Sequence, residues 1–188
     1  MKRLFLIPML IALLFNFANA DEYVIDTAHS HVAFSVKHMT IATVKGEFKK
    51  FDGEIEFDTQ TKKLLKLTGS IESASIETGI IKRDGHLKSA DFFDAQKFAN
   101  IEFVATKITD DAVIGNLSIK GITKEITLEP SINGVIKDFQ GNTRVGFSLE
   151  GKINRKDFGL TWNKLLESGG VVVGDKIKIM IDIEAIKL

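Results

Sequence analysis

Hydrophobic and polar residues alternate with a period of two over most of this chain. The clearest example comes early, where every second residue forms one mostly apolar row: Ser30, Val32, Phe34, Val36 and His38. Successive side chains of a β-strand point to opposite faces, so this row predicts a strand with one apolar wall. We expect that wall to line the interior of a closed β-barrel.

Further strands are predicted wherever the alternation returns. They fall at residues 54–58, 65–75, 101–106, 113–119, 126–130, 143–153 and 177–184. Polar turn sequences separate them, of which Asp52-Gly53 is the strongest, and residues 39–44 are expected to form a short connector. Pro130 is expected at a strand edge or end, because proline cannot donate a hydrogen bond to a neighbouring strand.

The alternation breaks down between residues 77 and 100, where charged residues cluster. One or two short helical turns are expected there, the second of them capped by Ser89 or Asp91. The segment also carries several large apolar side chains: Leu87, Phe92, Phe93 and Phe98. These are too many for a loop in solvent, so we expect the segment to pack over an end of the barrel.

About eight antiparallel strands, one short helical insertion and no β-α-β alternation place the chain in the all-β class. Eight strands that close into a barrel leave an interior that side chains fill or that holds one slender ligand. The chain has 188 residues and no internal linker, so one domain is expected over residues 21–188. Its 14 Phe, against one Trp and one Tyr, favour a large dry interior.

The first twenty residues have the pattern of a secretory signal peptide. Lys2 and Arg3 provide a basic start, an apolar run follows, and Ala18-Asn19-Ala20 supplies the small residues that a signal peptidase recognises. The apolar run is shorter than the roughly 20 residues of a membrane-spanning helix. We expect cleavage after Ala20 and export of a protein that has no stable insertion in a membrane.

The composition argues against several classes of partner and site. Without Lys2 and Arg3 the chain carries 23 basic and 25 acidic residues. This near balance argues against nucleic acid or an anionic membrane surface as the main partner. The chain contains no Cys, so disulfides, thiolate metal sites, Cys nucleophiles and Fe–S clusters are excluded.

The histidines are the first candidates for chemistry. His29 and His31 share one face of an extended chain and His38 lies on the other, but zinc usually takes three or four ligands. The pair favours a structural or hydrogen-bonding role over a metal site. The sequence shows no nucleophile elbow, catalytic carboxylate pair or phosphate-binding loop, so we expect neither an enzyme nor a cofactor nor a metal.

A few polar side chains could meet the head group of an amphiphilic ligand: His38, Arg83, His86, Arg155 and Asn163. Each could equally be a surface charge or part of an internal ion pair. The spacing of Arg155 and Asp157 favours a structural pair between these two. Trp162 is expected to plug an end of the barrel, where it could also contact a ligand.

A series of motifs, taken in order, resembles the YceI-like family. They are D-x-x-H-S-x-V-x-F-x-V-x-H-M at 26–39, G-E-F-K-K-F-D-G at 46–53, H-L-K-S-A-D-F-F-D at 86–94, I-E-F at 101–103, G-N-L-S-I-K-G-I-T-K at 115–124, N-R-K-D-F-G at 154–159 and V-G-D-K-I-K-I at 173–179. They extend over the whole chain after residue 20. The set is specific, although no single motif is.

The resemblance implies a lipocalin-like antiparallel barrel in the bacterial periplasm, which holds a polyisoprenoid or other long-chain amphiphile, and it suggests a homodimer. It also implies a tunnel lined by Val32, Phe34, Val36, Phe48, Phe103, Phe147 and Leu149. We extend this expected apolar site to further large side chains: Phe51, Phe57, Phe92, Phe93, Phe98, Leu117, Ile119, Phe158 and Trp162.

Two alternative functions stay open at this point. His29, His31 or His38 could serve a metal- or haem-binding protein or an enzyme of the periplasm. The barrel could instead be a closed, packed core in a stress-related structural protein, filled by the 11 Phe residues that follow residue 20.

Overall fold

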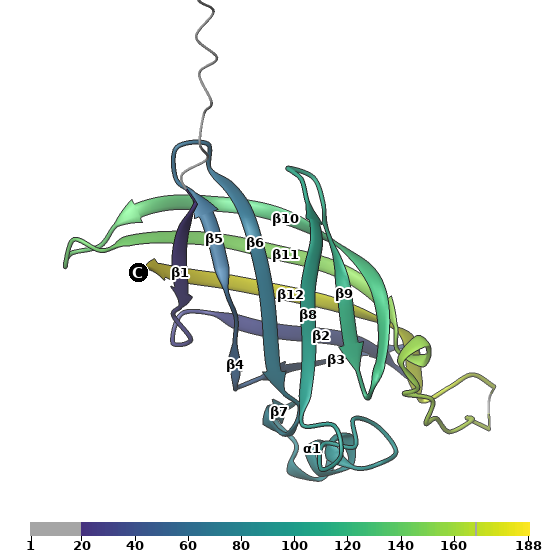
Figure 1. Ribbon diagram of the computed structural model, residues 1–188. Helices are drawn as coiled ribbons and strands as arrows, with labels where there is room; N and C mark the ends of the chain where they lie inside the picture. The colour runs from purple at the N-terminus through teal and green to yellow at the C-terminus, as the bar shows by residue number, and fades with distance from the viewer. Residues whose placement is uncertain (1–19, 168) are drawn as a thin grey trace, which may run out of the picture.

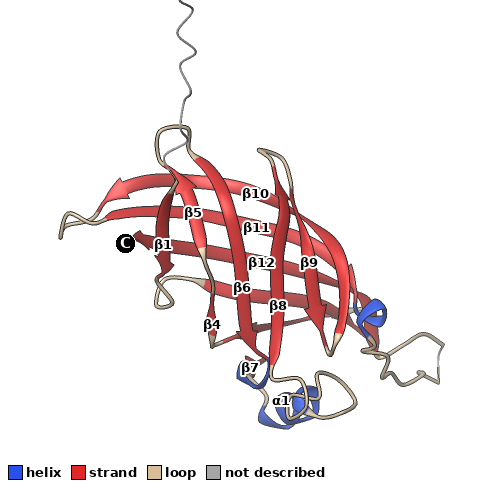
Figure 2. Cartoon of the chain, in the orientation of Figure 1, coloured by secondary structure: helices blue, strands red, loops and turns tan. Residues whose placement is uncertain are grey.

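The computed structural model describes residues 20–167 and 169–188, which form an antiparallel β-structure with one α-helix (Figures 1 and 2). Its twelve strands are β1 (Asp21–Ile25), β2 (His31–His38), β3 (Ala42–Phe48), β4 (Phe51–Asp52), β5 (Ile55–Asp58), β6 (Lys63–Glu72), β7 (Ile76–Glu77), β8 (Asn100–Ile108), β9 (Val113–Ile119), β10 (Ile122–Lys137), β11 (Thr143–Asn154) and β12 (Val173–Lys187). The helix α1 spans Ile81–Lys88, and short 3-10 turns span Ser73–Ser75 (η1) and Arg155–Phe158 (η2). The expected signal peptide, apart from Ala20, lies outside the described residues.

Eight strands form a closed ring, as the sequence predicts for an all-β barrel. The order around the ring is β1-β5-β6-β8-β9-β10-β11-β12, and pairing of β1 with β12 closes it. Tyr23 is the register partner of Lys187 at this closure and of Ile55 on the other side. The alternating pattern therefore sends one row of each strand into the interior and the other row to solvent.

The wall of the barrel next to β12 is built from different strands at its two ends. The C-terminal part of β12 pairs with β1, whereas residues 173–182 pair with β2. β3 lies beside β2, and its last residues pair with β7, which leads into α1. In Figure 1, α1 accordingly lies at the lower end of the barrel, where the sequence places an apolar insertion.

Three local expectations are corrected by the structure. The connector after β2 is shorter than residues 39–44, because β3 already begins at Ala42. β10 does not end at Pro130 but continues past it. Its pairing with β9 ends at Leu128, so the missing N–H of Pro130 costs no hydrogen bond to β9. Neither Ser89 nor Asp91 caps a second helix; Ser89 is the C-cap of α1, and its backbone N–H donates to His86 O.

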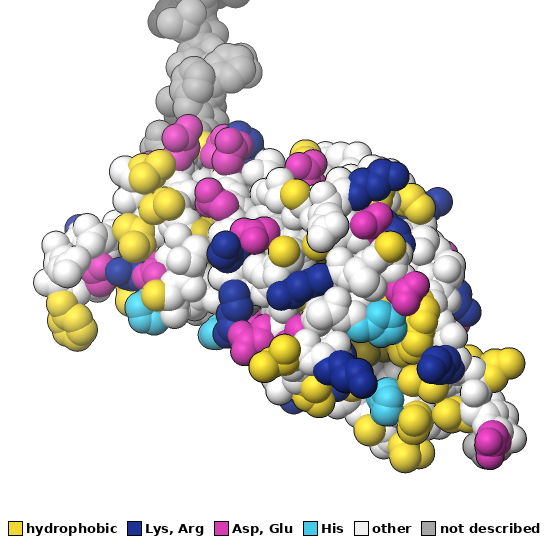
Figure 3. Space-filling view, turned by 90° about the horizontal axis from the view of Figure 1, so that it is seen from below, with side chains coloured by type: hydrophobic (Ala, Val, Ile, Leu, Met, Phe, Trp, Pro, Cys, Tyr) yellow, Lys and Arg dark blue, Asp and Glu magenta, His cyan; other side chains and the backbone are white. Residues whose placement is uncertain are grey.

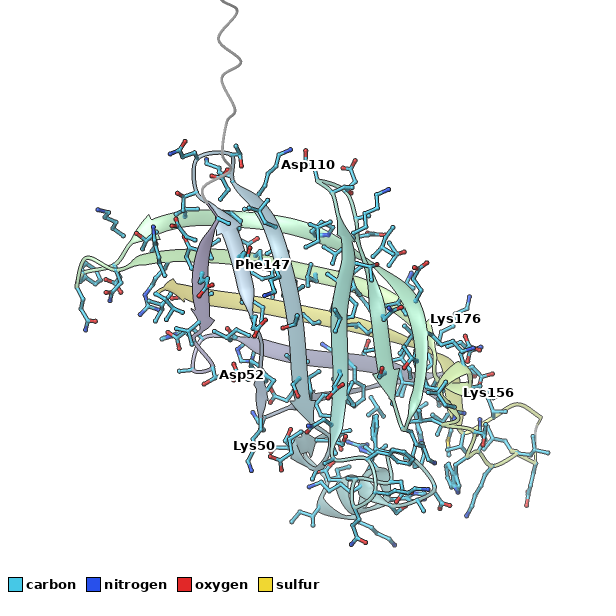
Figure 4. The ribbon with its side chains drawn as sticks, viewed as in Figure 1. Lys50, Asp52, Asp110, Phe147, Lys156 and Lys176 are labelled. Carbon is cyan, nitrogen blue, oxygen red and sulfur yellow. The ribbon has the colours of Figure 1, made fainter. Side chains whose placement is uncertain are left out.

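The interior of the barrel contains a packed region and an apolar cavity, which we call the packed half and the hollow half; Leu67, Leu128, Leu149 and Ile183 belong to both. The packed half contains twelve buried residues, among which Phe57, Phe147 and Val145 are fully enclosed. A second cluster of buried residues, including Phe48, Phe92 and Phe158, surrounds the lower end. Figure 4 shows Phe147 inside the barrel, away from α1.

Charged side chains join the loops at the end opposite α1. Arg144 Nη1 lies 2.7 Å from Asp26 Oδ2 and 2.6 Å from Glu184 Oε1, and Arg144 Nε lies 2.8 Å from Asp138 Oδ2. These groups come from the β1–β2 turn, the β10–β11 hairpin and two strands, so the guanidinium holds four segments together. No helix among the described residues is long and apolar enough to cross a membrane.

Replacing Phe147 and Phe139 with alanine compares a fully buried ring with a fully exposed one. We predict that Phe147→Ala lowers the free energy of unfolding by about 3–5 kcal/mol, because it removes a fully buried ring from the packed half. Phe139→Ala removes a fully exposed ring and should change it by less than about 0.5 kcal/mol. Urea titrations measure both, and equal effects would contradict the assignment.

The Arg144 network predicts a loss of stability in acid. Hydrogen bonding to Arg144, and then to His29, lowers the pKa of Asp26 to about 2, and Arg144 also lowers the pKa of Asp138. A carboxyl whose pKa is lower in the folded than in the unfolded state stabilises the fold above its unfolded pKa, and this contribution disappears as the pH falls. The free energy of unfolding should therefore decrease from about pH 5 towards pH 2.

Arg144→Met should make this decrease shallower, because the two aspartates then lose the guanidinium that lowers their pKa values. Denaturant titrations at a series of pH values compare the two proteins. An equally steep decrease in the variant would show that other carboxyls are responsible.

Candidate functional site

An apolar cavity occupies the hollow half of the barrel. Its volume is about 190 Å³, and its wall is formed by side chains of strands all around the ring, together with α1 and the segment after it. The polar side chains on this wall are Asp52, Thr68 and Arg155. For comparison, an engineered apolar cavity of about 150 Å³ stays dry and binds benzene. The site therefore suits a slender apolar group.

Most of the apolar residues predicted from the sequence lie on this wall. They are Val32, Phe34, Val36, Phe48, Phe51, Phe92, Phe93, Phe103, Leu117, Ile119 and Leu149. They come from β2, β3, β4, β8, β9 and β11 and from the segment after α1. Their contact with a ligand remains a prediction, but the structure brings them together around one space.

The other predicted apolar residues lie elsewhere. Phe57 and Phe147 belong to the packed half, and Phe158 is buried in the lower cluster behind the wall. Phe98 packs over Gly121, where an added methyl group would lie 2.7 Å from the ring. Trp162 contacts residues of the wall from outside the cavity, as described below. The alternating pattern cannot separate these positions, because a packed interior and a hollow one share the same period.

Sequence reasoning missed the isoleucine row of β12. Ile177, Ile179, Ile181 and Ile183 all line the cavity. The signal was present, since these residues alternate with polar ones along the last strand. Ile179 and Ile181 also pack against both buried clusters, so they mark the boundary between the hollow and packed halves.

Phe34 shows how the backbone makes room for the wall. It is the register partner of Gly46 on β3, and its ring lies over that glycine. A methyl group on Gly46 would lie 2.5 Å from Phe34 Cζ, which no real contact allows. The ring centre of Phe34 lies 5.9 Å from that of Phe48. A glycine at this position thus lets an aromatic side chain cross the strand toward the cavity.

Aromatic side chains bridge the lower end of the cavity. The ring of His86 on α1 stands edge-on to Trp162, with centroids 4.7 Å apart, and to Phe92 at 5.1 Å. Trp162 belongs to residues 159–167 and 169–172, which we call the mouth loop. His86 Nε2 also lies 2.8 Å from Asp91 Oδ2. Trp162 and His86 therefore join the mouth loop to the helical insertion at the edge of the cavity.

Arg155 is buried at this end and anchors the mouth loop. Its Nη1 donates to Leu160 O and, at 3.0 Å, to Trp162 O, while Nε donates to Gly174 O at 2.9 Å. Nη2 donates to Val173 O and to Asp175 Oδ1, both at 3.3 Å. These contacts match the five N–H groups of a guanidinium, so none is left over for a head group.

The ion pair of Arg155 corrects an expectation from the sequence. Its partner is Asp175 and not Asp157, because β12 brings Asp175 back beside η2. Burial lowers the pKa of the Arg155 guanidinium, and the charge of Asp175 opposes that shift. The motif around η2 therefore positions an internal anchor and not a surface pair.

The remaining polar candidates also have internal partners or lie off the wall. Asn163 Nδ2 donates to Val173 O at 2.8 Å, and its Oδ1 accepts from the Val173 N–H at 3.1 Å. Arg83 Nε donates to Thr78 Oγ1 at 2.7 Å. His38 ends β2 opposite Val173, and neither it nor His86 lines the cavity. The structure thus brings these side chains to the lower end without pointing them into the cavity.

The histidines of β2 lie too far apart to share a metal. β2 has eight residues and rises about 3.3 Å per residue, which separates His31 from His38 by about 23 Å. His29 does lie with Asp26 and Glu184 in a group that could ligate a cation. The two carboxylates of that group are already bound to Arg144, which supplies their positive partner.

Comparison with known proteins decides the family. The family model described as "YceI-like domain" matches residues 23–185. The chain belongs to the YceI-like family. A "UPF0312 protein" of Staphylococcus aureus (strain MSSA476) is 40% identical over 158 residues, which covers 84% of this chain and 92% of that protein. The fold, the barrel and the cavity described above are thus those of a YceI-like protein.

Solved structures agree with this assignment. The YCEI protein of Campylobacter jejuni is 37% identical and superposes with a TM-score of 0.70, covering 88% of this chain and 98% of its own. BcnA of Burkholderia cenocepacia, at 22% identity, gives 0.72 with 85% and 98% covered. A polyisoprenoid binding domain from Saccharophagus degradans, at 14% identity, gives 0.65 with 88% and 98% covered. The last two share the YceI-like fold at low sequence identity.

Arg155→Lys tests the anchor of the mouth loop. Lysine keeps the charge but has a single nitrogen, so most of the carbonyl contacts are lost in a buried position. We predict a decrease of about 2–4 kcal/mol in the free energy of unfolding and a red shift of Trp162 fluorescence. Lys156→Gln is the control, since Lys156 also pairs with Asp175 but is half exposed. A similar decrease in the stability of Lys156→Gln would show that the loss comes from the charge of Asp175 and not from the carbonyl contacts of Arg155.

Proposed function

We propose that this protein binds a polyisoprenoid or other long-chain amphiphile in its barrel and carries or stores it in the periplasm. The observation that supports this most is an apolar cavity within the ring, with the fully buried rings of Phe57 and Phe147 packed beyond its wall. Such a site receives the end of an apolar chain and offers it no exit on the other side. The polyisoprenoid binding domain from Saccharophagus degradans shares the fold, which supports the same class of ligand here.

The energetics of the wall suit an alkyl or prenyl chain. Each buried CH₂ group contributes roughly 0.8 kcal/mol, so a few isoprene-sized segments suffice for tight binding without a specific head-group contact. The cavity of about 190 Å³ is smaller than the roughly 300–1,000 Å³ of common ligand pockets. We infer that it holds the tail end of the chain, while the remainder extends through the mouth between α1 and the mouth loop.

The polar head would then lie outside the cavity. This agrees with the internal bonding of Arg155 and Asn163, which leaves those side chains to hold the loop and not the ligand. Export by the signal peptide predicted at residues 1–20 would place the carrier in the periplasm. A carrier there needs no reacting group, and the apolar wall provides none of the paired bases and nucleophiles of a hydrolase.

The alternatives from the sequence are less well supported. For the metal, haem or enzymatic alternative at His29, His31 or His38, the last two lie at opposite ends of β2, and the carboxylates beside His29 already pair with Arg144. A fully packed barrel does not fit an apolar cavity of about 190 Å³. The carrier function uses both the hollow half and its apolar wall, so it is the proposal we test.

Lipid extraction followed by mass spectrometry tests the proposed ligand class. We predict that the purified protein retains or takes up polyprenyl lipids added from detergent, and that Ile179→Trp reduces uptake about tenfold or more by filling the floor of the cavity. Lys178→Trp places the same ring on the outer face of β12 and should leave uptake unchanged. Melting curves would check that both variants fold. Unaltered uptake in Ile179→Trp, or none in the wild type, would refute the proposal.

A further inference from the structure

Exposed apolar side chains surround the mouth of the cavity. Ile41 in the β2–β3 turn, Ile81 at the start of α1 and Leu165 in the mouth loop are 86%, 92% and 85% exposed. We call these three residues the apolar tips. The same segments, or the strands next to them, send other apolar residues into the cavity: Val36, Leu87 and Leu160. Each segment therefore contributes both to the cavity and to the surface around it.

The three segments meet at one end of the molecule. The Met39 N–H in the β2–β3 turn donates to Val172 O of the mouth loop at 2.9 Å. The rings of His86 and Trp162, 4.7 Å apart, join α1 to the same loop. Figure 3, seen from below, shows hydrophobic side chains gathered at this end. The tips thus project from the same end of the barrel, beside segments that line the cavity.

A lysine accompanies each tip. Lys82 follows Ile81, Lys164 precedes Leu165, and Lys37 stands on β2 shortly before the turn that carries Ile41. Within residues 20–167 and 169–188, none of these lysines has a carboxylate partner within salt-bridge distance, although Glu167 is an acidic residue of the mouth loop. The rim therefore combines exposed apolar groups with three lysines that make no salt bridge among the described residues, although Asp84 and Glu167 lie near two of them in the sequence.

We propose that this end of the barrel docks on the surface of an anionic lipid bilayer. The apolar tips would enter the boundary between head groups and acyl chains, and the lysines would lie at the level of the anionic head groups. The proposal rests on the carrier function, because a chain leaving the bilayer would then enter the cavity without crossing water. The docking is peripheral, in keeping with the expectation that the chain does not insert stably.

Local charge here outweighs the overall charge. The near balance of basic and acidic residues predicts no general attraction to an anionic membrane, but docking depends on the charges within a Debye length of the surface, about 10 Å at 0.1 M salt. A lipid surface also suits the spacing of the tips. They stand on three separate segments, and a fluid bilayer accepts them without the fixed complementary pockets that a protein partner would need.

Vesicle flotation tests the docking surface with the chain from Asp21 onward. The complete ring and both buried clusters are built from residues after Ala20, so this chain contains the whole barrel, without the apolar run of residues 4–17. The vesicles contain phosphatidylcholine alone or phosphatidylcholine with phosphatidylglycerol, and no polyprenyl lipid. We expect binding to the mixed vesicles, weaker binding to the neutral ones, and loss of the difference in 1 M salt.

Two variants and one control assign the binding to the rim. The triple variant Ile41→Ser, Ile81→Ser and Leu165→Ser should reduce the partition coefficient about tenfold or more, because each side chain would leave water on docking. Replacing Lys37, Lys82 and Lys164 with Gln should remove the preference for anionic vesicles. Phe139→Ser removes an exposed ring at the β10–β11 hairpin, on the opposite side in Figure 1, and should have no effect.

The outcomes separate this proposal from the carrier function. No binding of the wild type, or equal losses in the triple variant and Phe139→Ser, would overturn the docking surface. Melting curves would check the fold of the variants, which we expect to be unchanged because all three tips are exposed. Uptake of polyprenyl lipid from detergent is measured in parallel. Uptake of the lipid without vesicle binding would leave the carrier function in place and refute docking. Vesicle binding through the tips without uptake would support docking and refute the carrier function.

Discussion

The pairing of β12 is the interaction on which the rest of the structure depends. This strand of fifteen residues pairs with β11 along one edge and with β2 and then β1 along the other. It therefore closes the ring and also attaches the β2–β3 extension that forms one side of the mouth. A shift of its register by one residue would turn the isoleucine row outward and place Lys178 and Asp182 in the interior. Closure of the ring and an apolar cavity are thus fixed by the same ladder of hydrogen bonds.

The two ends of the closed ring are filled differently. Phe57 and Phe147 are fully enclosed in the upper half, whereas the lower half keeps an apolar cavity between the side chains of its wall. By the relation of about 24 cal/mol per Å³ for cavities, an empty space of this size would cost roughly 4–5 kcal/mol. A bound apolar chain would recover much of that amount. Side-chain burial in the packed half then offsets the loss of stability that an empty cavity causes.

The sequence predicts the class of the fold and the apolar character of the site, but it does not predict which residues line the cavity. Alternation identified the strands, and the apolar rows on β2, β8, β9 and β11 do line the cavity. It could not separate Leu149, which lines the cavity, from Phe147, which does not, because both point inward from the same strand. Arg155 illustrates a different limit. Its partner Asp175 is brought near only by the return of β12, which local spacing does not contain.

The two ends of the barrel are closed by different chemistry, and this difference gives the site its direction. At one end Arg144 draws Asp26, Asp138 and Glu184 together, a network that fixes the loops and is expensive to open. At the other end the ring of His86 meets Phe92 and Trp162 through edge contacts, which are individually weak. Arg155 also anchors the mouth loop at that end, so the ring contacts are the weaker part of its closure. This asymmetry supports the proposed entry of an apolar chain beside the mouth loop.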